Sequence, residues 1–242
     1  MNIITSPQNP HLRQLRRLTR KRDRERAGRF VAEGEDLIAA AELAGWPALE
    51  GYRVTGSELG GSGFTDVEEK ALAAVSTLGS GTRVIGVYEQ RWAKAPVGPL
   101  CVYLHGVGDP GNLGTVLRSA QAFGASSVAV GPDCADPYSP KAVRASMGAI
   151  FGVPVARVES ITELPGERVA LVAHAGEPLR RSSGPTTLLV GAEREGLPED
   201  VVSACERVAH IPIEGESLNA AMAATVALYE TTRQPSRVTR DD

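Results

Sequence analysis

Three turns, the first of them rich in glycine, carry most of the side chains in this sequence that could do chemistry. They span residues 106–112, 191–196 and 211–219, and they contain amide, carboxylate and hydroxyl groups. Each turn follows an apolar run of strand length and precedes a helical pattern. Because the carboxyl ends of parallel strands meet at one edge of a sheet, we expect the three turns to form one ligand crevice.

The first turn, Gly106–Gly111, also matches the G-x-G-x-x-G pattern of dinucleotide-binding proteins, with Asp133 roughly twenty residues further on. Glycines let the backbone approach a phosphate, and a helix N-terminus favours anions. A nicotinamide-dependent oxidoreductase is therefore an alternative, but it leaves the other two turns unexplained. A simple strand-to-helix turn with a cap, such as Ser217, is the structural alternative for each turn taken alone.

No residue spacing in the sequence indicates a metal site. None of the four histidines stands at ligand spacing from cysteines or acids. His105, just before the first turn, is a candidate general base, although a histidine at a strand end is more often a structural residue. The cysteines Cys101, Cys134 and Cys205 are far apart and odd in number. They indicate a reducing compartment rather than a disulfide framework.

Positive charge is concentrated at the N-terminus. Residues 1–30 hold nine basic side chains against two acidic ones, in a chain whose net charge is −3. Eight of the nine are arginines, whose planar donor groups suit phosphate. The alternative is a helix whose charges serve only solubility. We predict an RNA-binding surface formed by Arg13, Arg16, Arg17, Arg20 and Arg22.

Strand and helix patterns alternate along the chain and predict two α/β units. In the first, strands near 30–32, 52–56 and 82–90 enclose a helix from about residue 35 and another over 66–76, capped by Asp66. Residues 91–99 read as a linker. From Leu100, continuous apolar strands alternate with helices and predict a mostly parallel sheet covered on both faces. We place the domains at 1–95 and 96–242.

No run of eighteen apolar residues occurs, so we expect no membrane-spanning segment. The first residues lack the apolar core of a secretion signal, and their acids argue against a transit peptide. We therefore expect a cytoplasmic protein.

The three turns and their flanks resemble, in order, the three motifs of the SpoU (TrmH-type) RNA 2′-O-ribose methyltransferases of the SPOUT superfamily. The matching segments are DPGNLGTVLRSAQAFGA at 109–125, LLVGAEREGL at 188–197 and IPIEGESLNAAMAATVALYE at 211–230. The intervening SPKAVRASMGAIFGVPV, at 139–155, is also similar. The first unit more loosely resembles the substrate-binding domain of ribosomal-protein-L30 type that often precedes this catalytic domain.

This resemblance implies an α/β catalytic domain with a deep trefoil knot and a mostly parallel sheet, preceded by a small L30-like α/β domain. It implies a homodimer with active sites at the subunit interface. It also implies an enzyme that uses S-adenosylmethionine to methylate a ribose 2′-hydroxyl, most simply in 23S rRNA. A tRNA methyltransferase and a non-catalytic RNA-binding paralogue remain alternatives.

Matching the motifs position by position also implies the site residues. Backbone contacts to the cofactor fall on Leu189, Gly191, Ile211 and Leu218. Groups around the reacting ribose fall on Asn112, Arg118, Glu193, Ser217 and Asn219. The sequence departs from the family where only Glu216 separates Gly215 from Ser217, which shortens the loop that should close over the cofactor.

Three of these assignments have alternatives. Arg118 is expected to anchor a phosphate and stabilise a developing alkoxide, because a guanidinium stays protonated and is a poor base; alternatively it pairs with an acid at the edge of its helix. Glu193 could instead cap a helix. Arg144 is compatible with contact to RNA or to a partner subunit.

Overall fold

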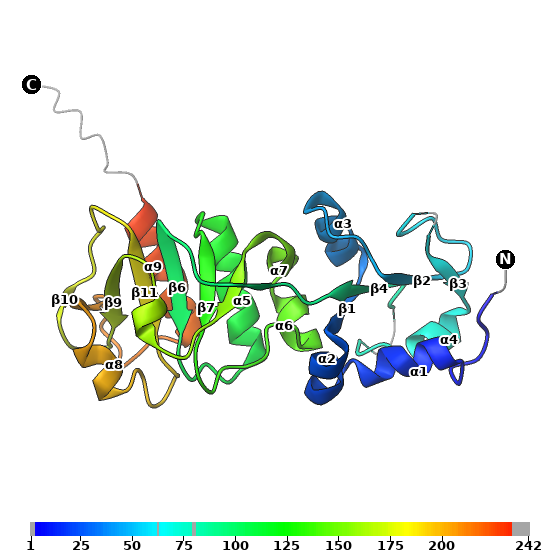
Figure 1. Ribbon diagram of the computed structural model, residues 1–242, viewed down its shortest axis with the longest axis horizontal. Helices are drawn as coiled ribbons and strands as arrows, with labels where there is room; N and C mark the ends of the chain where they lie inside the picture. The colour runs from blue at the N-terminus through cyan, green and yellow to red at the C-terminus, as the bar shows by residue number, and fades with distance from the viewer. Residues whose placement is uncertain (1–2, 62, 79–80, 234–242) are drawn as a thin grey trace, which may run out of the picture.

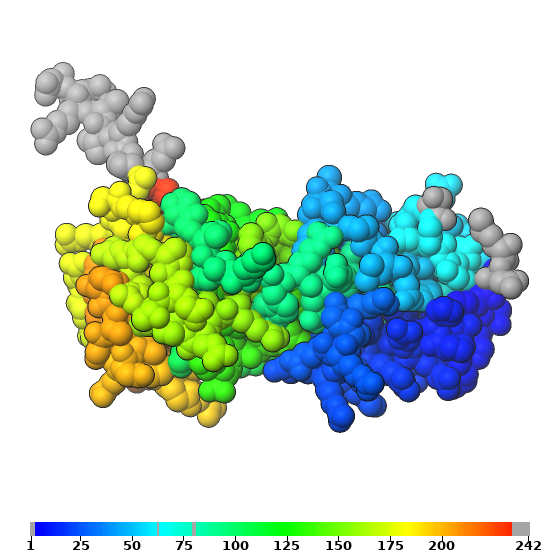
Figure 2. All heavy atoms as spheres, in the orientation of Figure 1, coloured from blue at the N-terminus to red at the C-terminus, as the bar shows by residue number. Residues whose placement is uncertain are grey.

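The computed structural model describes residues 3–61, 63–78 and 81–233. Two α/β units lie side by side along the long axis of the molecule (Figure 1). The N-terminal unit is built on a four-stranded sheet and the C-terminal unit on an eight-stranded sheet. Figure 2 shows the N-terminal helices, in blue, covering the lower part of the first unit.

The sheet of the first unit has the strand order β1-β4-β2-β3. Strand β4 pairs antiparallel with β1 and β2, and β3 joins β2 in parallel. The strands are β1 (Arg29–Glu33), β2 (Glu50–Val54), β3 (Thr65–Val67) and β4 (Val84–Glu89). The helices are α1 (Pro10–Arg17), α2 (Lys21–Ala27), α3 (Glu35–Leu43) and α4 (Glu69–Ala73).

The arginine-rich segment forms two helices, α1 and α2, rather than one. Leu12, Leu15 and Leu18 recur on one face and are buried against the sheet. The arginines between them are therefore turned outward to solvent. This amphipathic spacing, which the charge alone does not reveal, anchors the basic surface to a folded domain.

The helix expected over residues 66–76 with Asp66 as its cap is wrong at its start. Residues 65–67 form β3, and α4 begins only at Glu69. The Asp66 carboxylate accepts a hydrogen bond of 2.9 Å from Arg53 Nε on the neighbouring strand. Pairing across the sheet therefore engages the carboxylate that was expected to cap the helix.

The second sheet has the order β10-β12-β9-β11-β6-β7-β8-β5, and all of its strand pairs are parallel, as predicted. Its strands are β5 (Trp92–Ala93), β6 (Leu100–Leu104), β7 (Ser127–Val130), β8 (Val155–Arg157), β9 (Glu167–Leu171), β10 (Glu177–Pro178), β11 (Thr186–Val190) and β12 (Arg207–His210). Strands β6 and β11 are buried along their whole length, because both faces of the sheet are covered.

Helices cover this sheet on two sides. They are α5 (Pro110–Ala122), α6 (Pro140–Ala145), α7 (Ala149–Gly152), α8 (Glu199–Ser203) and α9 (Ala220–Thr232), with a 3₁₀ turn at Ile161–Glu163. Alternate residues of β6 serve opposite cores: Val102 packs with α5 and α9, whereas Tyr103 packs in the smaller core that includes Val201 of α8.

The predicted linker, residues 91–99, is partly a strand. Trp92–Ala93 forms β5, the outermost strand of the second sheet, in register with Val155 and Ala156. Backbone pairing with β8 thus outweighs the linker-like composition. The domain boundary between residues 95 and 96 and the trefoil knot stay predictions.

The two units share one hydrophobic core. Phe30 of β1 lies 4.8 Å, between ring centroids, from Tyr138 and 5.8 Å from Phe151 of the second unit. Gly148, at φ +92°, comes so close to α3 that an added Cβ would lie 2.4 Å from the Ala40 Cβ. Apolar packing therefore joins the units directly.

Within the described residues, no helix is long and apolar enough to cross a lipid bilayer. In the same part of the chain, no group of three or more histidine, cysteine or acidic side chains could hold a metal ion. All three cysteines are free thiols.

Candidate active site

A cavity of about 700 Å³ opens at the carboxyl ends of β9, β11 and β12. The loop after β11 and the residues leading into α9 form its walls. Apolar residues and glycines make up most of the lining, and its charged members are Glu193, Arg194, Glu195 and Glu199. The lining includes Leu171, Val190, Gly191, Glu193, Glu195, Val208, Ile211, Ile213, Ser217 and Leu218.

Three side chains from three separate turns are hydrogen-bonded to one another beside this cavity. Asn112 Nδ2 donates to Glu193 Oε1, and Asn219 Nδ2 donates to Asn112 Oδ1 over 3.2 Å. All three positions were expected near the ribose. The fold therefore joins Asn112 in one polar network to Glu193 and Asn219, which lie 81 and 107 positions further along the sequence.

Asp109 holds the first turn in place. It caps α5 by accepting hydrogen bonds from the backbone N–H groups of Gly111 (2.7 Å) and Asn112 (3.0 Å). The hydrogen bond from Lys141 Nζ, with these backbone bonds, lowers the pKa of the Asp109 carboxyl. Since a carboxylate already pairs with the helix N-terminus, this turn does not offer the open anion site that a dinucleotide pyrophosphate needs.

The third turn is capped by Asn219, not by Ser217. Asn219 Oδ1 accepts from the backbone of Ala221 (3.0 Å) and Met222 (3.3 Å) at the start of α9. Ser217 as a helix cap is therefore wrong, and its side chain lines the cavity instead. In the shortened loop, Gly215 and Glu216 are exposed, while Leu218 is half-buried in the cavity wall.

The second turn depends on a glycine. An added Cβ on Gly191 would lie 2.1 Å from the Gly196 carbonyl carbon and 2.4 Å from Leu197 N. Ala192 and Gly196 close this turn with a pair of backbone hydrogen bonds. Glu193 lies within it, well before α8 begins at Glu199, so a helix-capping role for Glu193 is wrong.

Of the four residues expected to contact the cofactor, three line the cavity and one does not. Gly191, Ile211 and Leu218 line the cavity. Leu189 is fully buried and packs in the smaller core, on the strand that leads to the cavity. Its side chain supports the sheet rather than the cavity wall.

Arg118 does not line the cavity. It lies six residues after Asn112 on α5, about two helical turns away, and is exposed. Within residues 3–61, 63–78 and 81–233 it makes no ion pair, so the expected alternative of an acidic partner is wrong. Its guanidinium is available to an incoming group.

Two further candidates, His105 and Arg144, lie close to other residues of the protein. His105 Nδ1 lies 2.9 Å from the hydroxyl of Tyr103, and burial raises the pKa of that hydroxyl to about 12. This contact gives His105 a structural role, which is the alternative to its acting as a general base. Arg144 is exposed and lines a small cleft with Glu33 and Leu37 of the first unit, so it faces the junction between units.

A second hollow, of about 600 Å³, lies between α1 and α2. We call it the basic groove; Arg13, Arg17 and Arg26 line it, with Gln14 and Asp23 among its other residues. Arg16, Arg20 and Arg22 are exposed but stand outside its lining. Arg26 was not among the arginines expected to bind RNA, because α2, with the sequence KRDRERA, has no apolar spacing that would mark its outward face.

Two family models match the chain, one over each of its two units. Residues 99–229 match the SpoU rRNA Methylase family, and residues 9–94 match the MRM3-like substrate binding domain. The chain belongs to the SpoU rRNA methylase family. The substrate-binding match covers the four-stranded unit that carries the basic groove.

Two relatives and a solved structure are similar to this SpoU family member over nearly their whole length. A Synechocystis protein called an uncharacterized tRNA/rRNA methyltransferase is 30% identical, over 96% of this chain and 93% of its own. The 23S rRNA (guanosine(2553)-2′-O)-methyltransferase RlmP of Bacillus subtilis is 28% identical, with 95% and 98% covered. The AdoMet-bound rRNA methyltransferase of Sinorhizobium meliloti superposes with a TM-score of 0.84 at 32% identity, covering 95% and 96% of the two chains.

Proposed function

We propose that this protein is a methyltransferase that transfers a methyl group from S-adenosylmethionine to a ribose 2′-hydroxyl of 23S rRNA. One observation carries the proposal: the Asn112–Glu193–Asn219 network stands beside a cavity large enough for the cofactor. The names of the relatives support the reaction, the cofactor and the kind of RNA. A ribosomal substrate implies work in the cytoplasm.

The cavity suits S-adenosylmethionine. Pockets of roughly 300–1,000 Å³ accommodate ligands of this size, and this one has about 700 Å³. Ile211, Ile213 and Leu218 offer apolar surface to an adenine ring. Three glutamates and one arginine, Arg194, also line the cavity, so acidic side chains outnumber basic ones around a cationic ligand. When bound, the cofactor supplies a methyl group on a positively charged sulfur.

The polar residues then have to place the ribose, while its 2′-hydroxyl proton passes to water as the new carbon–oxygen bond forms. Asn112 and Asn219 orient the sugar through their amides, while Glu193 holds Asn112 in position. Alignment of the hydroxyl with the methyl carbon is a large part of such a reaction. Arg118 binds a backbone phosphate and stabilises the developing negative charge on the oxygen.

A homodimer explains how Arg118 reaches the site. Met222, Val226 and Tyr229 are exposed along one side of α9, which packs on α5. Helical neighbours at this spacing form a continuous apolar stripe that a second copy would cover. Ser119, the neighbour of Arg118 on α5, bonds Thr225 of α9, so we place Arg118 beside this stripe, where the cavity of a second copy would come within its reach.

RNA reaches the site along one edge of the molecule. Helices α1 and α2 lie along the lower edge in Figure 1, as does α8 beside the cavity. The basic groove attracts phosphates, largely without regard to sequence. The four-stranded unit then supplies selection by shape, as is usual for RNA readers.

Methyl transfer to defined RNA tests the proposal. The purified protein should move labelled methyl from S-adenosylmethionine to 23S rRNA, and nuclease digestion should yield a 2′-O-methylated nucleotide. Transfer to tRNA but not to 23S rRNA would mean that the substrate is tRNA. Cofactor binding by calorimetry without any transfer would indicate a non-catalytic paralogue, and no cofactor binding would overturn the proposal.

A further inference from the structure

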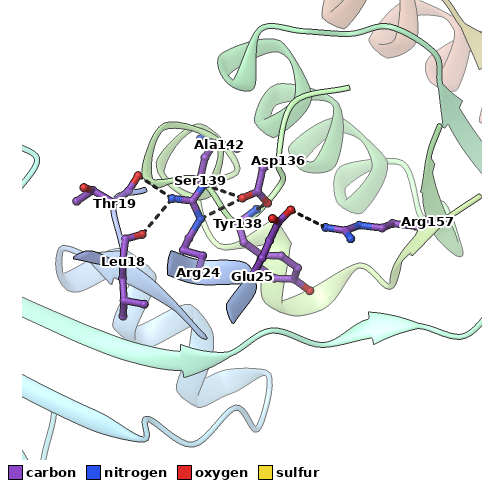
Figure 3. A network of polar contacts seen from close by, with 9 residues as sticks. All are labelled: Leu18, Thr19, Arg24, Glu25, Asp136, Tyr138, Ser139, Ala142 and Arg157. Atoms are coloured by element: carbon purple, nitrogen blue, oxygen red, sulfur yellow. Dashed lines mark hydrogen bonds and ion pairs between the residues drawn. The ribbon is translucent and has the colours of Figure 1, made fainter. Parts of the chain in front are cut away.

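One arginine of the basic segment is not available to RNA. Arg24, on α2, has a side chain only 3% exposed, and its partner Asp136, in the loop after β7, is 5% exposed. Arg24 Nε and Nη2 donate to Asp136 Oδ2 over 3.0 and 2.6 Å. This pair joins the N-terminal helices to the second unit (Figure 3).

The remaining donor of Arg24 holds the corner between the two basic helices. Nη1 donates to the carbonyl oxygens of Leu18 (3.0 Å) and Thr19 (2.7 Å), where α1 ends. Leu18 also lines the basic groove. A single guanidinium thus fixes α1, α2 and the catalytic unit to one another, which a lysine ammonium cannot do because it lacks the planar fork.

Asp136 is tied to the active site through packed elements. It accepts from the backbone N–H of Tyr138 (2.9 Å), in the loop that leads into α6. Helix α6 packs so closely on α5 that a Cβ on Gly114 would lie 2.4 Å from the Ala142 carbonyl oxygen. Helix α5 carries Asn112 at its start, so the chain of contacts ends at the polar network.

Tyr138 adds a second link of the same kind. Its hydroxyl donates to the Arg91 carbonyl (2.6 Å) and accepts from the Arg91 N–H (3.1 Å), at the chain crossing between units. Glu25 and Arg157 make a longer ion pair nearby, at 3.8 Å. Hydrogen bonds and ion pairs therefore add to the apolar packing between the two units.

We infer that Arg24 is a positioning residue: its buried pair with Asp136 sets the basic groove at a fixed distance and angle from the methyl-transfer site. A buried ion pair adds little stability over apolar packing, but its directional bonds favour one geometry. RNA held in the groove then presents its ribose in register with the cavity. This inference rests on the proposed function, and it concerns RNA long enough to touch both units.

Methylation of two RNAs tests the inference. Arg24→Lys keeps the charge, and Arg53→Lys, which alters an arginine–aspartate pair that lies wholly within the first unit, is the matched control. On full-length 23S rRNA transcript, Arg24→Lys should lower kcat about tenfold with KM little changed, since small misplacements are costly. On the shortest fragment that the wild-type enzyme still methylates, it should act like the control. An equal loss on both RNAs, or no loss, overturns the inference.

A second measurement does not depend on methylation. Spin labels at Gln14→Cys on α1 and Asp200→Cys on α8, diluted with unlabelled protein, report the distance between the units. The distance distribution should broaden in Arg24→Lys and stay narrow in Arg53→Lys; an unchanged distribution in Arg24→Lys contradicts the inference. If wild-type protein methylates no RNA, the proposed function fails while this readout still decides the role of Arg24.

If Arg24→Lys does not fold, Tyr138→Phe provides the same test with a smaller loss of contacts. It removes the two hydrogen bonds to Arg91 and keeps the ring against Phe30. We expect the same selective loss on long RNA, of a few-fold only. Wild-type kinetics on long RNA would contradict the inference.

Discussion

The basic groove and the three-turn site lie in different units, and they are built in opposite ways. The arginines that line the groove are exposed and make no ion pair within the described residues. At the three-turn site, the side chains already pair with one another and with helix ends. Charge without fixed partners gives long-range, salt-dependent attraction, whereas a pre-formed network gives alignment. Substitutions in the two regions should therefore leave different kinetic and binding signatures.

The largest effect is expected at Arg118, which lies outside the cavity and makes no ion pair with the residues that the structure describes. Arg118→Ala should reduce the single-turnover rate of methyl transfer about 10²- to 10³-fold, the loss typical when one charge-stabilising group is removed. Cofactor affinity, measured by calorimetry, should stay within about twofold of wild type because Arg118 does not line the cavity. A near-wild-type rate would remove Arg118 from the mechanism.

Mixed dimers sharpen the same prediction. Arg118→Ala subunits combined with subunits inactive in the cofactor cavity should regain activity if Arg118 serves the partner's site. One intact site per mixed dimer then forms. Absence of any regain would place Arg118 in the site of its own subunit.

Gly191→Ala should act on the cofactor rather than on RNA. An added Cβ meets the backbone at Gly196 and displaces the second turn, so S-adenosylmethionine affinity should fall about 10- to 100-fold. Gly215→Ala is the matched control, because within the described residues no atom lies within 4 Å of its added Cβ. RNA affinity should be unchanged in both variants. Equal cofactor affinity in the two would refute a cofactor role for this turn.

Two charge-matched triple variants separate the groove from a diffuse basic surface. Arg13, Arg17 and Arg26 changed to Gln should lower the magnitude of the salt slope of RNA binding by about 2 to 3, since each phosphate contact contributes about 0.9. The same change at Arg16, Arg20 and Arg22, outside the groove, should have a smaller effect. Titrations of RNA binding at several salt concentrations measure both. Equal effects would mean that only the net charge matters.

Much of the catalytic unit could be predicted from sequence because its patterns are local. Continuous apolar runs predicted β6, β7 and β11 and their parallel sheet, and the motifs indicated the family. Trp92–Ala93 and Asp66 were misread because long-range strand pairing decides their structure. Local composition does not contain that information.

The basic segment shows a second limit of sequence reasoning. Its charge predicted an RNA-binding surface, but charge alone cannot separate Arg24, which is buried against Asp136, from Arg26, which lines the groove. Which face of a short helix is buried depends on the neighbouring unit. The assignments of individual site residues stay predictions that the variants above address.

The smallest effect is expected at Asp109, which supports the three-turn site by capping α5. Asp109→Ala should lower the free energy of unfolding by about 1 kcal/mol through loss of the α5 cap. Because the pKa of this carboxyl is lowered in the folded state, its contribution is present above the unfolded pKa and is lost as the pH falls through the folded one. Denaturant unfolding at neutral and acid pH should therefore separate wild type from variant at neutral pH and bring them together in acid. Asp109→Asn, which keeps the cap oxygen, should retain most of the stability and lose the pH dependence. A constant difference between wild type and Asp109→Ala at every pH would show that the cap acts without its charge.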